Sequence, residues 1–192
     1  MKEIEIKIKL DDRDALIKKV AALGGKLADR GIQHDIIYDD GKGFYDAHKV
    51  LRLRKLNQKV QLAYKEKLSK TDDAHMLERV EIQTEVENYE AMDLIIKQLG
   101  FFPHREKEKK FIDYLLDGLK IEFHTLPFLG EFMEIESADQ IHLVKILNQL
   151  GLDISMGINR DYSTLFAEYC KKNNLPNDTP CTFEEEQKIN KQ

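Results

Sequence analysis

The chain has 192 residues, which is enough for one domain with a substantial core and too short for two domains of ordinary size. Lysine and arginine together number 30 and aspartate and glutamate 35, so the net charge is −5, which argues against non-specific binding to nucleic acid. No apolar run approaches the roughly 18 residues of a membrane-spanning helix, and only two cysteines are present, so we expect a cytoplasmic protein without a disulfide framework.

The first predicted element is a strand over residues 3–10, where aliphatic and charged side chains alternate strictly. Asp11 and Asp12 then predict the start of a helix that ends near residue 23. Asn57 and Gln58 separate two short alternating segments and indicate a hairpin. The later elements are predicted strands over residues 27–39, 50–54, 60–65, 77–87, 106–116, 119–125 and 131–137, and predicted helices over residues 89–99, 139–149 and 161–172.

The last part of the chain differs in composition from the rest. Residues 173–192 hold two of the four prolines and the acidic run Glu184–Glu186, a pattern typical of weakly ordered segments. We therefore expect a single domain over residues 1–172, followed by a weakly ordered tail over residues 173–192.

The polar faces of the predicted strands carry charged side chains at alternate positions, which places them on one face of a sheet. One interpretation is an open antiparallel sheet with a solvated outer face. The other is a sheet rolled into a barrel, with helices over its aliphatic outer face and the charges inside. In a lumen, arginine and lysine bind phosphate oxygens and paired glutamates bind Mg²⁺ or Mn²⁺. The charged positions are Glu3, Glu5, Lys7, Lys9, Arg52, Arg54, Lys65, Lys67, Arg79, Glu81, Glu85, Glu87, Lys107, Lys109, Glu122, His124, Glu134 and Glu136.

The segment Glu3-Ile4-Glu5-Ile6-Lys7 resembles the N-terminal E-x-E-x-K signature of the CYTH superfamily, which comprises class IV adenylyl cyclases, thiamine triphosphatases and other triphosphate tunnel enzymes. Its position in the first predicted strand makes this resemblance specific. Further segments are similar to the family pattern in the same order: Gln33 to Asp39, Leu51-Arg52-Leu53-Arg54, Tyr64-Lys65-Glu66, Arg79 to Glu85, Leu129 to Glu136 and Arg160-Asp161-Tyr162-Ser163.

The resemblance implies an α+β fold, a closed eight-stranded antiparallel β-barrel with helices packed on its outside, and a triphosphate held in the tunnel with Mg²⁺ or Mn²⁺. The residues that it implies for catalysis are Glu3, Glu5 and Lys7. Those implied for substrate binding are Lys7, Arg52, Arg54, Lys65, Lys107, Lys109 and Arg160. Those implied for metal binding are Glu3, Glu5, Glu81, Glu85, Glu134 and Glu136.

Two positions depart from the family pattern. The family has K-x-R before a tyrosine where this chain has the run Glu106 to Phe111, so which lysines of the run point inward depends on a one-residue register. An inward aspartate of the next strand falls here on His124, or on Glu122 if the register shifts. The details of metal binding therefore remain open at this stage.

Three functions are compatible with this pattern. Hydrolysis of thiamine triphosphate, inorganic triphosphate or a nucleotide is preferred, because water needs no second pocket. The first alternative is a class IV adenylyl cyclase that converts ATP to cyclic AMP and pyrophosphate. The second is a non-catalytic module that binds triphosphate or polyphosphate. The partner expected is a small-molecule triphosphate, with neither nucleic acid nor membrane and with a homodimer left open.

Overall fold

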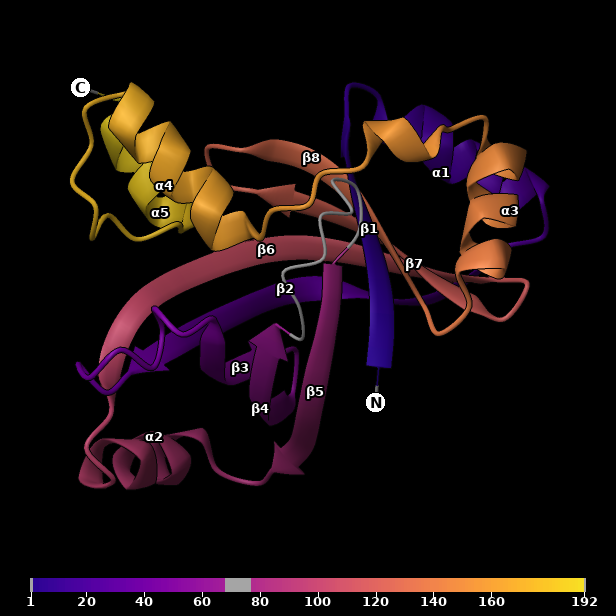
Figure 1. Cartoon of the computed structure of the whole chain (residues 1–192). Helices are drawn as coiled ribbons and strands as arrows, with labels where there is room; N and C mark the ends of the chain where they lie inside the picture. The colour runs from indigo at the N-terminus through magenta and orange to yellow at the C-terminus, as the bar shows by residue number, and fades with distance from the viewer. Residues whose placement is uncertain (1, 68–76, 192) are drawn as a thin grey trace.

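The computed structural model describes residues 2–67 and 77–191, with the backbone alone at residues 2–3, 67 and 77–79. No helix among these residues is long and apolar enough to cross a membrane. In chain order the elements are β1 (Lys2–Leu10), α1 (Arg13–Ala22), β2 (Lys26–Asp39), β3 (Lys49–Leu56), β4 (Lys59–Lys67), β5 (Leu77–Val86), α2 (Tyr89–Gln98), β6 (Phe102–Leu116), β7 (Leu119–Leu126), β8 (Gly130–Ser137), α3 (Gln140–Leu150), the short 3₁₀ helix η1 (Ile154–Met156), α4 (Tyr162–Lys172) and α5 (Phe183–Ile189) (Figure 1).

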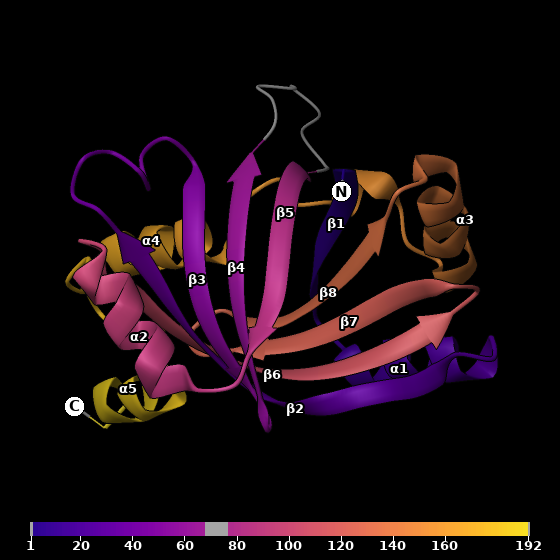
Figure 2. The same ribbon diagram turned by 90° about the horizontal axis from the view of Figure 1, so that it is seen from below.

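The eight strands form one antiparallel sheet in the order β1-β5-β4-β3-β2-β6-β7-β8, which confirms the predicted eight-stranded α+β fold. The sheet curves strongly (Figure 2), and β1 pairs with both β5 and β8. The two ladders of β1 differ in length. The ladder to β8 covers residues 4–10, whereas the ladder to β5 covers only residues 2–5. Strand β1 therefore pairs with β5 only near its own N-terminus, and it pairs with β8 along most of its length.

The aliphatic face of the sheet is its outer face. Ile6 and Ile8 of β1 and Ile135 of β8 are fully buried in one cluster with Leu143 and Leu147 of α3. Helix α1 adds two buried residues to the same cluster. Because alternation sends every second side chain to the opposite face, the charged residues of these strands must point into the concave side. Burial of the outer face thus determines which side chains form the interior.

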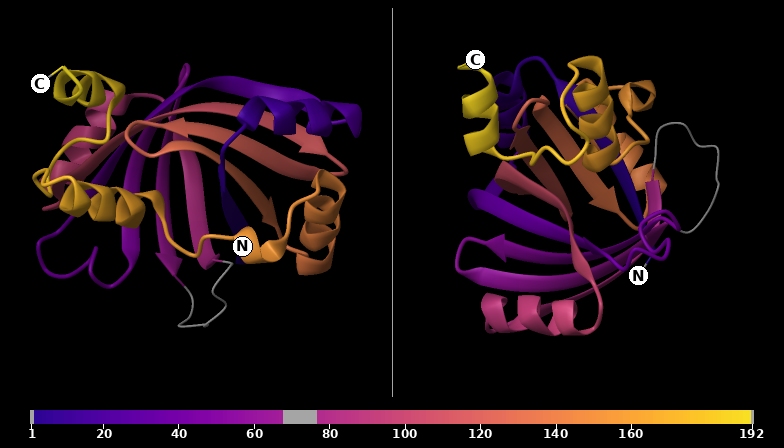
Figure 3. Two further views of the ribbon diagram at one scale, coloured as in Figure 1. Left: turned by 90° about the horizontal axis from the view of Figure 1, so that it is seen from above. Right: turned by 90° about the vertical axis from the view of Figure 1, so that its left-hand side faces the viewer.

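Two other helices cover the remaining parts of the sheet. Helix α2 begins after the N-cap Asn88 and packs Ile96 against Tyr38 and Leu53 of β2 and β3. Helix α4 packs Phe166 against the end of the sheet near the turn between β7 and β8. The right-hand view of Figure 3 shows α2 on one side of the sheet and the pair α4 and α5 on the other. Helix α2 therefore covers the outer face of β2 and β3, and α4 covers the end of the sheet near β7 and β8.

The end of the chain differs from the expected weakly ordered tail. Cys181 is 5% exposed and forms a parallel bridge with Lys107 of β6. Its N–H donates to the Glu106 carbonyl at 3.0 Å, and its own carbonyl accepts from the Glu108 N–H at 2.8 Å. Helix α5 follows with Thr182 as its N-cap. The prediction failed because composition does not show that a strand edge is available for this segment.

Candidate active site

A cavity of about 420 Å³ lies on the concave side of the sheet and receives side chains from all eight strands and from α4. Its volume is within the range of small-molecule sites in proteins. Its basic side chains are Lys7, Arg52, Arg54, Lys65, Lys107, Lys109 and Lys120, and its acidic side chains are Glu5, Glu81, Glu108, Glu122, Glu134, Glu136 and Asp161. The charges are sorted by strand, so the cavity has two unlike sides.

The first side, called here the basic wall, consists of Arg52, Arg54, Lys65, Lys107 and Lys109. These residues come from β3, β4 and β6. Strands β3 and β6 lie on either side of β2, and β4 pairs with β3. The ladders place Arg54 and Lys107 on either side of the same β2 residue, Asp35. Strand pairing thus gathers cations that are far apart in the chain.

Asp35 is the buried carboxylate that holds the basic wall in place through Arg54. It is completely buried, and its carboxylate accepts from Arg54 Nε at 2.8 Å, from Arg54 Nη2 at 3.1 Å and from Gln33 Nε2 at 2.9 Å. Burial alone would raise the pKa of Asp35, but Arg54 and Arg52 hold it well below its usual range. One buried carboxylate therefore orients the guanidinium of Arg54 with a two-pronged contact.

The rest of the basic wall has more positive charge than its neighbours neutralise. Burial and the nearby Arg54 lower the pKa of Arg52 to about 10. Burial, together with Arg52 and Arg54, lowers the pKa of Lys107 to about 8 even though Asp35 acts in the opposite direction. Among the residues that the structure describes, none is a hydrogen-bond partner of the buried Arg52 Nε. A polyanion in the cavity would supply both the missing acceptor and the missing negative charge.

The second side, called here the acidic wall, consists of Glu5, Glu122, Glu134 and Glu136. They come from β1, β7 and β8, which are consecutive in the sheet, and the ladders pair Glu5 with Glu136 and Glu122 with Glu134. Burial and the charges of Glu122 and Glu5 raise the pKa of Glu136 to about 8. Glu136 therefore lacks a matching positive charge and would be stabilised by a cation, whereas Lys109 holds the pKa of Glu122 and Lys7 that of Glu134 below their usual range.

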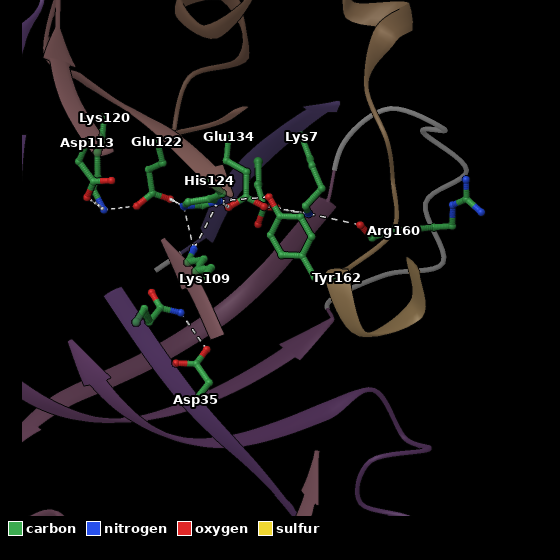
Figure 4. Close-up of polar contacts among 12 residues, drawn as sticks. Lys7, Asp35, Lys109, Asp113, Lys120, Glu122, His124, Glu134, Arg160 and Tyr162 are labelled. Carbon is green, nitrogen blue, oxygen red and sulfur yellow. Dashed lines mark hydrogen bonds and ion pairs between the residues drawn. The ribbon is translucent and has the colours of Figure 1, made fainter. Parts of the chain in front are cut away.

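Lys7 lies within the acidic wall rather than the basic one. Its Nζ is 2.8 Å from Glu5 Oε1 and 2.9 Å from Glu134 Oε1, and it donates to the Arg160 carbonyl at 3.3 Å. Burial would lower the pKa of Lys7, but Glu134 and Glu5 outweigh burial and raise it. Figure 4 shows Lys7 at one end of a row of side chains that continues through Glu134 to His124.

The amino-acid sequence matches the CYTH domain family over residues 1–149. The chain belongs to the CYTH family. A protein named "putative adenylate cyclase" from Methanocaldococcus jannaschii is 28% identical over 181 residues, which are 86% of this chain and 98% of that protein. A solved Pyrococcus horikoshii structure is 26% identical and covers 86% of this chain and 98% of its own, with a TM-score of 0.71.

A more distant CYTH-like structure carries a name that combines both chemistries. It is a Hippeastrum protein described as a "putative adenylyl cyclase" with a dominant triphosphatase activity. It is 17% identical to this chain, and it covers 91% of this chain and 97% of its own, with a TM-score of 0.61. At this identity the likeness concerns the fold alone.

Several of the residues predicted for the CYTH site meet at the cavity. Lys107 and Lys109 share the inward face of β6, so the register left open by the sequence is the one that places both lysines in the cavity. His124 and Glu122 were alternatives for one inward position, but they are two residues apart on β7 and both face the interior. Glu81 also faces the cavity, where it pairs with Lys65 on the basic wall rather than with the other carboxylates.

Other predicted residues lie elsewhere. Glu85 shares the inward face of β5, but it lies beyond the cavity, is 62% exposed and pairs with Lys59 at 3.2 Å. The Arg160 side chain points away from the row in Figure 4 and pairs with Glu168 at 2.7 Å, so it does not line this cavity, where its carbonyl accepts from Lys7, but it does line an adjoining one. The side chain of Glu3 lies outside the described residues.

Sequence reasoning missed three contributors. Asp35 was quoted only as part of a resembling segment, although an aspartate directly before the apolar run Ile36-Ile37-Tyr38 of a predicted strand is itself a signal of a paired buried charge. The Tyr162 hydroxyl lies 3.1 Å from His124 Nδ1, and the Tyr162 ring lies 4.4 Å from Lys7 Nζ. Lys120 pairs with Asp113 at 3.0 Å. Only the path of α4 and the stagger of the strands reveal the last two.

The pKa of Lys107 leads to a pH prediction. The side chain is an ammonium below about pH 8 and neutral above it, so affinity for inorganic triphosphate, measured calorimetrically without metal, should fall by about tenfold between pH 7 and pH 9.5. Lys107→Arg is the matched control, since its charge does not titrate in this interval and its affinity should change less. Equal pH profiles for the two proteins would remove Lys107 from the binding site.

Proposed function

We propose that this CYTH protein is a divalent-metal-dependent enzyme that hydrolyses a phosphoanhydride bond of a triphosphate bound in the cavity. The observation that carries the proposal is the pair of unlike walls. A basic wall, in which Arg52 Nε has no hydrogen-bond partner among the described residues, faces an acidic wall in which Glu136 lacks a matching cation. This arrangement is unfavourable while empty and complementary to a polyanion together with a cation.

The basic wall is the proposed triphosphate site. Arg52 and Arg54 project from alternate positions of β3, and Lys107 and Lys109 project in the same way from β6. Alternation places these four cations on one face, where together they can contact several oxygens of a phosphate chain. Arg54 is already oriented by Asp35, so its binding geometry is formed before the substrate arrives.

The acidic wall is the proposed metal site. Carboxylate oxygens are the ligands that Mg²⁺ and Mn²⁺ prefer, and Glu5, Glu134 and Glu136 lie on adjacent strands of one face. The raised pKa of Glu136 indicates that this carboxylate lacks a matching positive charge, and Glu5 and Glu134 share the single ammonium of Lys7, so these residues fit a divalent cation. When bound, the cation would act as a Lewis acid toward phosphate oxygens and lower the pKa of a water.

Lys7 is proposed to orient the acidic wall. Its ammonium is shared between Glu5 and Glu134 and so holds both carboxylates at fixed positions. The ring of Tyr162 covers that ammonium and limits access of bulk water to it. In this arrangement Lys7 reaches a phosphate only as a minor partner, since its charge is already matched.

A second candidate function is the class IV adenylyl cyclase reaction. A further cavity of about 420 Å³ adjoins the first and shares Arg52, Lys65, Lys107 and Asp161 with it. Its other walls include Tyr45, His48 and Val50, which offer apolar and aromatic surface for an organic group. This space, together with the name of the Methanocaldococcus relative, supports a nucleotide as substrate.

The deciding experiment is incubation of the protein with ATP, thiamine triphosphate or inorganic triphosphate, each with Mg²⁺ or Mn²⁺ and each with a chelator control. Release of inorganic phosphate that depends on metal is the expected result. Cyclic AMP and pyrophosphate as the main products would establish the cyclase instead. Calorimetric affinity for triphosphate without turnover of any substrate would overturn both reactions and indicate a binding module.

A further inference from the structure

A group of three buried potential metal ligands lies at the far end of the row from Lys7. Asp113 of β6 pairs across the ladder with Glu122 of β7, and His124 follows two residues later on the same face. One potential ligand atom from each residue lies within 4.8 Å of the others. None of the three belonged to the implied metal set, and Asp113 and His124 do not line the cavity. The group shares Glu122 with the acidic wall, but Asp113 and His124 set it apart from Glu5, Glu134 and Glu136.

Asp113 shows that the group lacks a partner. It is 5% exposed, and its buried Oδ1 has no hydrogen-bond partner in the described part of the chain. The other oxygen, Oδ2, is 3.0 Å from Lys120 Nζ, which also contacts Glu122. An ammonium thus lies between the two carboxylates, where a bound cation would lie. Because the Lys120 side chain is 45% exposed, it can leave for solvent without a buried charge being stranded.

The contacts of His124 determine which of its nitrogens is free to bind a metal. Lys109 Nζ is 2.8 Å from Nε2, and an ammonium can only donate, so the Nε2 lone pair accepts from Lys109 and becomes available to a metal when that ammonium is displaced. Nδ1 then carries the proton and faces Glu134 Oε2 at 3.2 Å. A histidine held through its second nitrogen by a carboxylate is the usual arrangement behind a metal-binding imidazole.

We propose that Asp113, Glu122 and His124 bind one divalent transition-metal ion at this end of the sheet. Two carboxylates and one imidazole favour Mn²⁺ or Zn²⁺ over Mg²⁺, because imidazole is a poor ligand for Mg²⁺ (Figure 4). Binding displaces the ammonium groups of Lys120 and Lys109 and supplies a partner for the Asp113 oxygen. The inference does not depend on the proposed function, since it concerns metal binding without substrate.

The test uses Mn²⁺ alone with the full chain and pulsed electron paramagnetic resonance, which detects a directly bound nitrogen. Wild-type protein and Glu136→Gln should both show the nitrogen coupling, because Glu136 belongs to the acidic wall and not to this group. His124→Gln should lose it. Excess Mg²⁺ should leave the coupling in place, whereas Zn²⁺ should abolish it. Absence of nitrogen coupling from both wild type and Glu136→Gln would overturn the proposal.

Two substitutions keep the test informative if His124→Gln does not fold. Asp113→Asn should weaken Mn²⁺ binding to this site by about tenfold or more, as followed by the same nitrogen coupling during titration. Lys120→Met should strengthen it, because it removes the competing cation, and a structural role for Lys120 would not produce this gain. Unchanged binding in Asp113→Asn, or weaker binding in Lys120→Met, would contradict the proposal.

Discussion

Replacing Glu5 by glutamine is expected to lower kcat by about 100-fold or more while the protein stays folded. The amide oxygen can still accept from Lys7, which now lies 2.8 Å from the carboxylate, so the shape of the acidic wall is kept. The lost negative charge weakens the proposed metal site. Steady-state kinetics with inorganic triphosphate over a range of Mn²⁺ concentrations would show the loss, with a higher metal requirement.

Glu85→Gln is the matched control. It makes the same chemical change on an inward-facing position, but Glu85 is 62% exposed and lies outside the cavity. Its kinetics should equal those of the wild type, and the unfolding free energy of this control should change by no more than about 0.5 kcal/mol. Metal-free binding of triphosphate should survive in Glu5→Gln, because it depends on the basic wall. Near-normal metal-dependent turnover in Glu5→Gln would overturn the metal assignment.

Replacing Asp35 by alanine is expected to reduce the unfolding free energy by about 3–5 kcal/mol, because it leaves buried cations without their counter-charge. Asp35 is completely buried and holds Arg54 through two contacts. Urea unfolding of the two proteins gives the difference. Inorganic triphosphate should restore part of the loss, since it supplies negative charge to the same wall and binds only the folded protein.

Asp29→Ala is the comparison for Asp35→Ala. Asp29 lies on the same strand, but it is exposed and accepts only from the Arg30 N–H at 2.8 Å. We expect a change of about 0.5 kcal/mol or less for this variant, with no response to triphosphate beyond that of the wild type. If Asp35→Ala is as stable as Asp29→Ala, the buried carboxylate does not support the basic wall.

Asp35 also makes the stability of the fold depend on pH, in a direction that its pKa determines. The folded-state pKa of Asp35 is depressed below the value of an unfolded chain, so its contribution is fully present above the unfolded pKa of about 4. It is lost as the pH falls below that value toward the folded pKa. Urea unfolding between pH 5 and pH 2.5 should therefore show a smaller loss of stability in Asp35→Ala than in the wild type.

The alternation of apolar and charged residues in the sequence correctly predicted which side chains share a face of each strand. Residues 3–10 predicted β1 to within one residue at its start, and the faces of β3, β6 and β8 follow from the same rule. Alternation determines a face but not a depth. Glu81 and Glu85 share one face of β5, yet only Glu81 reaches the cavity. The stagger between neighbouring strands sets the depth, and no single strand contains that information.

Residues outside the strands could not be placed from the sequence for a related reason. Arg160 precedes α4. The direction of its side chain depends on its ion pair with Glu168, which lies within α4. Tyr162, two residues later, enters the site because α4 covers the end of the sheet and buries Phe166 beside it. Tertiary packing, rather than local preference, decides which of these two neighbours faces the cavity.

The pairing of Cys181 with β6 has a consequence for the exposed edge of that strand. Strand β6 pairs with β2 over residues 102–115 but with β7 only over residues 110–116, so its earlier residues present a strand edge on that side. Such edges template the addition of strands from other molecules. The C-terminal segment occupies this edge at Lys107. A shortened chain ending after α4 would leave main-chain donors and acceptors of β6 open to a strand from a second molecule, at the same residues that form the basic wall.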